Sequence, residues 1–275
     1  MTKPIAIQGI RGSFHHEVAQ KYFSSTAEVI ECMSFDSAVD NLLQHQTDSM
    51  VMALENSIAG SIIPNYALID NHNLSIVGEY YLDIQHNLMA LKGETLATIK
   101  EVHSHPMALL QCKVFFKDYP HIKLVEAKDT AEVAKQVSKD NIKGIAAIAS
   151  KNAASLYQLD ILAESIQTIK HNETRFVIVR RENNNLERKG INKASLKFEL
   201  DHKRGSLATI LNVMSDCKLN LTKIQSLPKI ETPWKYAFFV DVTFDTHKDY
   251  EKAYAIMQIM AENFKVLGEY KNAKT

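Results

Sequence analysis

Short apolar runs alternate with helical patterns along the first two-thirds of the chain, and a polar or glycine-bearing turn follows each apolar run. The apolar runs lie at 4–8, 50–54, 101–104, 124–127 and 145–149. This alternation is typical of βα repeats and predicts parallel sheets with helices between the strands. In such sheets, ligands bind at the carboxyl ends of the strands, where helix N-termini present free backbone donors. The polar turns that follow the runs are therefore the candidate binding sites.

A domain boundary is predicted at 181–193, a segment with three consecutive Asn, one Gly and six charged residues and no apolar periodicity. Beyond it, the pattern predicts strands at 195–200, 219–226, 235–244 and 266–270 and helices at 206–216 and 248–263. The order βαββαβ is that of a ferredoxin-like unit, which has an open sheet face or edge and commonly pairs with a second copy. We therefore expect two domains, at 1–182 and 194–275, in a chain of 275 residues.

Composition narrows the class of protein. The formal net charge is zero, with 32 basic and 32 acidic residues, so the basic excess typical of nucleic-acid binding is missing and we expect no nucleic-acid partner. No run of about 18 apolar residues and no signal-like segment occurs, which predicts a cytoplasmic protein without a membrane partner. Cys32, Cys112 and Cys217 are widely spaced and lack the close Cys or His pattern of a zinc site. We expect reduced thiols and no bound metal.

The most suggestive polar group is Thr174 with Arg175, which precede an apolar run that begins at Phe176. The planar guanidinium of Arg suits a carboxylate, and the Thr hydroxyl can donate to an oxygen that leaves a substrate. A polar pair before a strand is commonly a solvated strand end, so the interpretation depends on other segments that carry matching chemistry.

Three further turns carry such chemistry. In ALENSIAG, the residues Glu55, Asn56 and Ser57 follow a strand, although Ser57 could instead cap a helix. Ser104 and Gln111 lie two helical turns apart and could face one pocket; alternatively, Ser104 caps the helix and Gln111 is solvated. In GIRGSF, which includes Ser13 and Phe14, two glycines allow a tight turn whose amides could bind an anion.

The sequence lacks the motifs that are usual for several kinds of catalysis. The sequence contains no nucleophile elbow, no glycine-rich loop with Lys for nucleotide phosphates and no complete dinucleotide pattern. We therefore expect no cofactor, and a site that binds a small polyanion and stabilises a departing oxygen.

The segments GIRGSF, ALENSIAG, VHSHPMALLQC, AAIAS and NETRF, in this order, resemble those of prephenate dehydratases over nearly the whole chain. This resemblance implies a lyase (hydro-lyase) that removes water and carbon dioxide from prephenate to give phenylpyruvate in phenylalanine biosynthesis. It also implies an α/β fold with two lobes like those of periplasmic binding proteins and an active site between them. By the same resemblance, the catalytic residues are Thr174, Arg175, Glu55, Asn56, Ser104 and Gln111, and Ser13, Phe14, Ser57 and Phe176 bind the substrate.

The last domain, with KRGSLATIL, LNLTKIQSLP and YAFFVD, resembles an ACT regulatory domain that binds L-phenylalanine as an allosteric inhibitor. The resemblance implies a ligand site formed against a second copy, hence a homo-oligomer, dimer or tetramer. Its residues would be Gly205, Ser206, Leu207, Ala208, Asn220, Leu221 and Thr222. Relatives often carry ESRP where this chain has Gln225, Ser226, Leu227 and Pro228, which leaves the strength of inhibition open.

Two other functions stay open. Arogenate, which carries an ammonium where prephenate has a ketone, could be the substrate, or the chain could be an amino-acid sensor without catalysis. Because the chain begins at the dehydratase motif and shows no Rossmann glycines, we expect a monofunctional enzyme. The group that protonates the leaving water is not identified by the sequence.

Overall fold

The computed structural model describes residues 3–181, 190–201, 203–229 and 235–274. Contacts between Cα atoms group the chain into two compact units, one of residues 1–60 and 82–176 and the other of residues 61–81 and 177–275. Most of the boundary expected at 181–193 lies outside the described residues, and the division into domains at 1–182 and 194–275 stays a prediction.

The first sheet has the strand order β2-β1-β3-β11-β5, and the short β4 pairs with β3. Its strands are β1 (Ile5–Gln8), β2 (Val29–Cys32), β3 (Ser49–Asn56), β4 (Gly60–Ser61), β5 (Ser75–Asp83) and β11 (Glu173–Arg180). Strand β1 pairs in parallel with both β2 and β3, as the alternating pattern predicts. The first six residues of β3 are buried, which is typical of a parallel strand covered on both faces. Helices α1 (Phe14–Tyr22) and α2 (Phe35–Leu43) contact these strands.

The second sheet has the order β10-β6-β9-β7-β8. Its strands are β6 (Asn87–Ala90), β7 (Glu101–Ser104), β8 (Lys123–Glu126), β9 (Ile145–Ala149) and β10 (Asp160–Ala163). Strand β7 is parallel to β8 and β9, whereas β6 is antiparallel to β9 and β10. The strands predicted at 101–104, 124–127 and 145–149 are thus parallel, as expected, whereas β6 and β10 were not predicted. Strand β6 follows β5 of the first sheet without an intervening helix.

Helices pack on both faces of this second sheet. They are α4 (Pro106–Cys112), α5 (Thr130–Lys139) and α6 (Lys151–Tyr157), and a short 3-10 helix at Phe115–Asp118 follows α4. Consecutive residues of β6 enter different apolar clusters: Leu88 packs with residues of α4, and Met89 with residues of α5 and α6. Because successive strand residues point to opposite faces, both faces are buried.

The third sheet, in the second unit, has the order β13-β14-β12-β15 and is antiparallel throughout. Its elements are β12 (Lys193–Glu199), α7 (Ser206–Asp216), β13 (Asn220–Pro228), β14 (Tyr236–Thr243), α8 (His247–Met260) and β15 (Glu262–Tyr270). The predicted βαββαβ order is confirmed, and α7 has the predicted bounds. The second helix, expected to continue to 263, ends at Met260, because Ala261 is already extended and β15 begins at once.

The two faces of β12 have different partners. Ala194, Leu196 and Phe198 join the apolar cluster that contains residues of α7 and α8. The alternate residues Lys193 and Lys197 form ion pairs with the segment 61–81, which contains α3 (Ile63–Asn71) and β5. Apolar and polar residues thus alternate along β12, so one face of the strand packs on helices and the other forms a polar interface.

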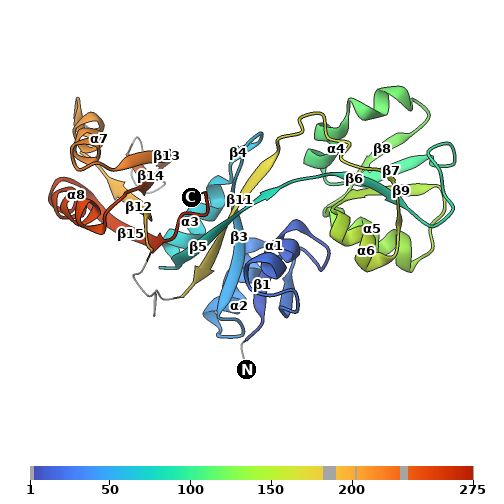
Figure 1. Ribbon diagram of the computed structural model, residues 1–275, viewed down its shortest axis with the longest axis horizontal. Helices are drawn as coiled ribbons and strands as arrows, with labels where there is room; N and C mark the ends of the chain where they lie inside the picture. Colours follow the sequence, from blue (N-terminus) through green and yellow to red (C-terminus); the bar gives the residue numbers. More distant parts are fainter. Residues whose placement is uncertain (1–2, 182–189, 202, 230–234, 275) are drawn as a thin grey trace. The chain divides into compact units, whose positions relative to one another are not determined.

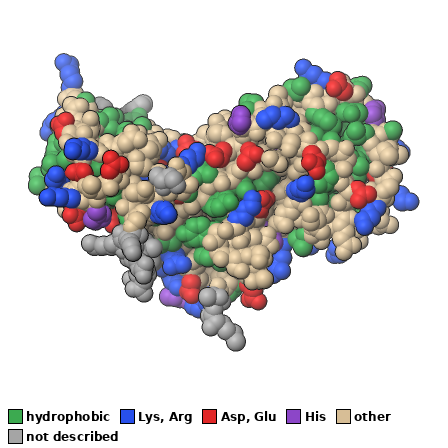
Figure 2. Space-filling model, in the orientation of Figure 1, with side chains coloured by type: hydrophobic (Ala, Val, Ile, Leu, Met, Phe, Trp, Pro, Cys, Tyr) green, Lys and Arg blue, Asp and Glu red, His purple; other side chains and the backbone are tan. Residues whose placement is uncertain are grey.

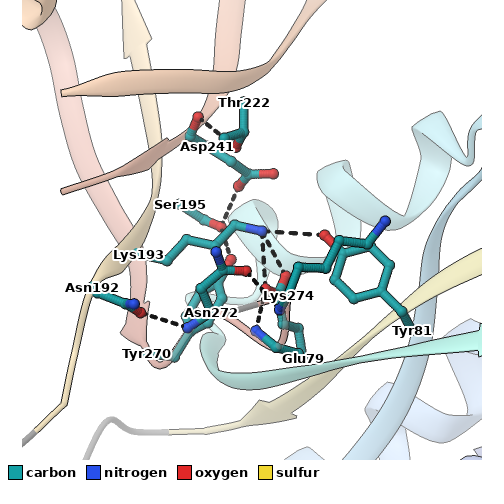
Figure 3. A network of polar contacts seen from close by, with 11 residues as sticks. Glu79, Tyr81, Asn192, Lys193, Ser195, Thr222, Asp241, Tyr270, Asn272 and Lys274 are labelled. Carbon is teal, nitrogen blue, oxygen red and sulfur yellow. Dashed lines mark hydrogen bonds and ion pairs between the residues drawn. The ribbon is translucent and has the colours of Figure 1, made fainter. Parts of the chain in front are cut away.

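The polar interface has a buried ion pair at its centre (Figure 3). Lys193 Nζ donates to both carboxylate oxygens of Glu79, at 3.0 and 2.8 Å, and to the Tyr81 hydroxyl at 3.3 Å. The side chains of Lys193 and Glu79 are 3% and 0% exposed. Beside them, Ser195 donates to Asp241 and shares a hydrogen bond of 2.6 Å with the Tyr270 hydroxyl. Buried charges are tolerated when they are paired and hydrogen-bonded in this way.

Further contacts hold the same segment against the sheet. Lys265 Nζ donates to Asp70 Oδ1 at 3.0 Å, and Lys197 Nζ lies 2.9 Å from Asp70 Oδ2. The backbone also approaches closely, since a Cβ at Gly268 would lie 2.1 Å from the carbonyl oxygen of Ile76. Only glycine fits where two backbones meet at this distance.

Charges of both signs are interspersed over the visible face (Figure 2), as expected for a formal net charge of zero. Within the described part of the chain, no helix is long and apolar enough to cross a bilayer. Cys32 and Cys112 are buried free thiols, and burial raises the pKa of Cys112 to about 12.

We expect Lys193→Met to lower the free energy of unfolding by about 3–5 kcal/mol, because it leaves the Glu79 carboxylate buried without its cation. The double variant Lys193→Met with Glu79→Leu should recover most of this loss. Chemical denaturation followed by circular dichroism measures both values.

A matched control is Lys151→Met, which removes an exposed pair with Glu164 whose side chains are 70% and 65% exposed. It should cost less than about 1 kcal/mol. Equal effects of the buried and exposed substitutions would contradict a structural role for the buried pair.

Candidate functional site

Two of the predicted catalytic residues meet where β3 ends and β11 begins. The Nδ2 atom of Asn56 donates to Thr174 Oγ1 at 2.9 Å and to Asn172 Oδ1 at 2.7 Å. Asn56 is half-buried and Thr174 is buried, so this junction excludes most water. The structure therefore brings together side chains that lie 118 positions apart in the sequence.

The orientation of the Asn56 amide is set by its own turn. Its Oδ1 accepts from the backbone N–H groups of Ile58, at 3.0 Å, and Ala59, at 2.8 Å. The NH2 side must then face Thr174, and an amide nitrogen can only donate. The Thr174 oxygen is thus the acceptor in this bond, and its own hydroxyl hydrogen remains available for an oxygen of a ligand.

The hydrogen bonds continue from Asn172 to α4. Asn172 Nδ2 donates to Gln111 Oε1 at 2.9 Å, and the same oxygen lies 2.8 Å from Nε2 of His86. The backbone carbonyl of Gln111 accepts from the amide and the hydroxyl of Thr168. Gln111 is therefore not a solvated helix residue but a member of the same network as Thr174.

The network lies where two connecting segments pass between the first and second sheets (Figure 1). These segments, which follow β5 and precede β11, are hydrogen-bonded to each other: the amide of Ile84 donates to the carbonyl of Asn172 at 2.6 Å, and the amide of Ile166 to that of His86 at 2.8 Å. Paired extended segments position His86 and Asn172 beside residues from both sheets.

Ser104 and Ser57 join neighbouring segments and do not cap the helices that follow them. The Ser104 hydroxyl donates to the carbonyl of Ile148 at 2.7 Å, and His105, not Ser104, caps α4. Ser57 Oγ accepts from the amide of Glu173 at 2.9 Å and so joins the loop to β11, whereas α3 begins only at Ile63. The helix-cap alternatives were therefore wrong for both serines.

The aromatic residues of the predicted site lie on two sides of it. Phe14 presents its ring at 76° to that of His86, with centroids 5.8 Å apart. Phe176 is buried against the ring of His15 at 5.0 Å. Ser13 caps α1 through a bond from the His16 amide. These contacts place Phe14 beside the network, and substrate binding by Ser13 and Phe176 stays a prediction.

Arg175 is 3% exposed and follows Thr174 in β11. Since successive strand residues alternate between faces, its side chain leaves the strand on the opposite side from that of Thr174. Glu55 has the same relation to Asn56 in β3. The structure therefore groups Thr174, Asn56 and Gln111 but not these two charged residues.

Three of the GIRGSF amides, which the sequence suggested could bind an anion, donate to acceptors within the protein. The Gly9 amide donates to the Cys32 carbonyl at 2.7 Å, that of Arg11 to Glu31 Oε1 at 2.8 Å, and that of Gly12 to His16 Nδ1 at 3.0 Å. These three amides therefore have protein acceptors and are not directed at a ligand. Acceptors contributed by β2 and α1 could not be recognised from the motif alone.

Sequence reasoning missed Asn172 and His86. Asn172 could have been found, because it lies two positions before Thr174 and residues at this spacing share one face of an extended segment. His86 has no such signal: it is an isolated histidine in a polar connection between two strands.

Comparisons with known proteins show the family of this chain. A family model described as prephenate dehydratase matches residues 5–184. The Arabidopsis thaliana protein named arogenate dehydratase/prephenate dehydratase 2, chloroplastic, is 34% identical over 276 residues, which cover 97% of this chain and 72% of the plant protein. The chain belongs to the prephenate dehydratase family.

Solved structures of two proteins share its fold over 98% of the chain. Prephenate dehydratase from Arthrobacter aurescens, in complex with L-Phe, has a TM-score of 0.89 at 25% identity, with 90% of that chain covered. A protein described as GqqA, a quorum quenching acylase, has a TM-score of 0.86 at 26% identity, with 98% of that chain covered.

In this prephenate dehydratase family member, the residues predicted to bind phenylalanine lie at two places in the third sheet. Gly205, with φ of 88°, caps α7, and Ser206, Leu207 and Ala208 form its first turn. Asn220, Leu221 and Thr222 begin β13. A helix of 11 residues, about 16 Å long, separates the two groups, so one copy alone does not bring them together.

A cavity of about 410 Å³ adjoins the first of these groups. Ser206, Thr209 and Ile210 of α7 line one side. The other lining residues come from the end of β12 and the end of α8: Leu200, Asp201, Lys203, Ile259, Met260, Ala261 and Glu262. Across the described ranges, no group of three His, Cys, Asp or Glu side chains is arranged to hold a metal ion.

His15 gives a pH-dependent prediction. Its ring contacts Phe35 and Phe176, its Nε2 is buried without a hydrogen bond, and burial lowers its pKa from 6.5 to about 4. The unfolded chain therefore binds a proton between pH 6.5 and 4 that the folded protein does not. In this window, His15 should reduce stability as pH falls, by at most about 1.4 kcal/mol per pH unit.

His15→Phe should make the loss of stability between pH 6.5 and 4 shallower, whereas substitution of the exposed His72 by Gln should leave the slope unchanged. Urea denaturation at several pH values measures the slopes. Identical slopes for the wild-type protein and His15→Phe would show that His15 titrates normally.

Proposed function

We propose that this protein is a prephenate dehydratase that converts prephenate to phenylpyruvate, carbon dioxide and water in L-phenylalanine biosynthesis. The observation that carries the proposal is the bond from Asn56 Nδ2 to Thr174 Oγ1, which leaves the threonine hydrogen for the hydroxyl that departs from the substrate. The matched family model supports the same reaction.

The reaction requires little beyond positioning. The bond from the ring to the hydroxyl oxygen breaks, the bond from the ring to the carboxylate breaks, and the electron pair of the latter completes the aromatic ring. The hydroxyl leaves as water after gaining one proton, so prephenate and one proton give phenylpyruvate, carbon dioxide and water. A hydrogen bond from Thr174 to the departing oxygen stabilises the charge that develops there, an effect worth about a hundredfold to a thousandfold in rate.

Gln111 is proposed to orient the substrate. Its Oε1 is occupied by Asn172 and His86, so its NH2 group is the part left to contact a carboxylate or carbonyl oxygen. Arg175 is proposed to supply the cation that attracts the two carboxylates of prephenate, although it leaves β11 on the face opposite Thr174. Glu55, Ser104, Ser57, Ser13, Phe14 and Phe176 are proposed to shape the pocket around these groups.

Regulation by L-phenylalanine is proposed to use an ACT-type third sheet. The two groups of predicted ligand-binding residues lie at opposite ends of α7, so a complete site needs α7 of one copy and β13 of another. We therefore propose a homo-oligomer, dimer or tetramer, in which phenylalanine binds between copies. The complex of the Arthrobacter aurescens relative with L-Phe supports a phenylalanine site in this family.

The direct test is the rate of phenylpyruvate formation from prephenate by the purified protein, with and without phenylalanine, with arogenate assayed in parallel. Turnover of prephenate that phenylalanine suppresses is the expected result. Turnover without suppression would refute regulation, preference for arogenate would reassign the substrate, and no turnover of either compound would favour a sensor.

Arg175→Ala should raise the KM for prephenate at least about tenfold, with a smaller change in kcat. The reason is that it removes a charge contact made equally to the bound substrate and to the transition state. Steady-state kinetics provide both values, and circular dichroism checks that this buried substitution leaves the protein folded. An unchanged KM in a folded variant would remove Arg175 from substrate binding.

A further inference from the structure

We propose that His86 is a positioning residue that fixes the side-chain amide of Gln111, so that the Gln111 NH2 group faces the substrate. This inference rests on the proposed function and adds to it a residue that no motif indicates. It follows from the direction of each hydrogen bond in the network.

The directions of the hydrogen bonds follow from Asn56, at one end of the network. The Ile58 and Ala59 amides occupy Asn56 Oδ1, so Asn56 Nδ2 must donate to Asn172 Oδ1. Asn172 then presents its own Nδ2 to Gln111 at 2.9 Å, and the Gln111 atom that receives it must be the oxygen. With Gln111 Oε1 assigned as an acceptor, the next residue that contacts it must be a donor.

That partner is the His86 ring, whose Nε2 lies 2.8 Å from Gln111 Oε1. Because the oxygen can only accept, Nε2 must carry a hydrogen. Gln111 Oε1 thus receives two donors, and a flip of its amide would turn its NH2 group toward two N–H groups. The flip is therefore disfavoured by two hydrogen bonds, not by one.

The ring of His86 is itself held in place. Its backbone amide donates to Gln167 Oε1 at 3.0 Å, its carbonyl accepts from Ile166 at 2.8 Å, and Phe14 packs edge-on against the ring. The residue is 4% exposed. Two backbone hydrogen bonds and one ring contact thus hold His86, so its side chain orients Gln111 at little entropic cost.

Burial also keeps the ring in one protonation state. Nδ1 is buried and has no hydrogen-bond partner within the described ranges, so a proton there would create a buried charge without an acceptor. Burial accordingly lowers the pKa of His86, an effect that the Gln111 bond opposes. A neutral ring has one N–H, and the network assigns it to Nε2.

Two substitutions of His86, by Gln and by Asn, test the proposal because they place an amide nitrogen at different distances from the backbone. The amide nitrogen of Gln can replace His Nε2, whereas that of Asn reaches only the position of Nδ1. We expect His86→Asn to lower kcat for prephenate by about 10- to 100-fold with KM changed less than about threefold, because a mispositioned group costs rate more than binding. His86→Gln should stay within about fivefold of the wild-type kcat.

The exposed His72→Asn serves as the control, and its kcat should equal that of the wild-type protein. Wild-type kcat in His86→Asn would overturn the proposal. Equal losses in His86→Asn and His86→Gln would also overturn it, because they would show that the ring is needed for packing and not for its Nε2 hydrogen bond.

A second readout does not depend on activity. In ¹⁵N NMR of histidine-labelled protein, the signal that disappears in His86→Gln should belong to a neutral Nε2–H tautomer. An Nδ1–H tautomer would overturn the proposal even in an active enzyme. Failure of the wild-type protein to convert prephenate would refute the proposed function instead, while the tautomer measurement would still decide the orientation of Gln111.

Discussion

The site depends on the orientation of one side-chain amide. Asn56 Oδ1 is occupied by two backbone N–H groups of its own turn, so its nitrogen must donate to both Thr174 and Asn172. This orientation determines the direction of each further hydrogen bond, from Asn172 to Gln111 and from His86 to Gln111, and so determines the tautomer of His86. The Asn56 and Gln111 amides are rigidly oriented, because a flip of either one would replace two hydrogen bonds with donor–donor contacts.

This rigidity suits a reaction that needs no cofactor chemistry. Aromatisation makes the conversion of prephenate favourable, so the protein has only to stabilise the departing oxygen and to hold the substrate in place. A hydroxyl whose oxygen already accepts a hydrogen bond is directed toward an outside acceptor. Thr174 is thereby prepared before the substrate binds, which is the condition for efficient electrostatic stabilisation.

Much of the fold could be predicted from the sequence, because local patterns determine it. Alternation along β12 and the helical period of α7 indicated the βαββαβ order, and α7 was predicted with its observed bounds. The antiparallel β6 could not be predicted in the same way. All its residues are buried, so its own pattern does not distinguish a parallel from an antiparallel neighbour.

The site was predicted in part for a similar reason. Thr174, Asn56 and Gln111 lie in motifs at strand or helix ends, and the structure joins them. His86 was missed because its importance comes from a partner 25 positions away. The acceptors of the Gly9, Arg11 and Gly12 amides were missed because they belong to other elements. Such pairings exist only after the chain has folded.

The most direct test of the role of Thr174 compares Thr174→Ser, which keeps the hydroxyl but loses the methyl group, with Thr174→Val, which keeps the shape but loses the hydroxyl. If the hydroxyl donates to the departing oxygen, Ser should keep kcat for prephenate within about tenfold, and Val should lower it by at least about a hundredfold with little change in KM. Nearly wild-type turnover by the folded Val variant would contradict the account.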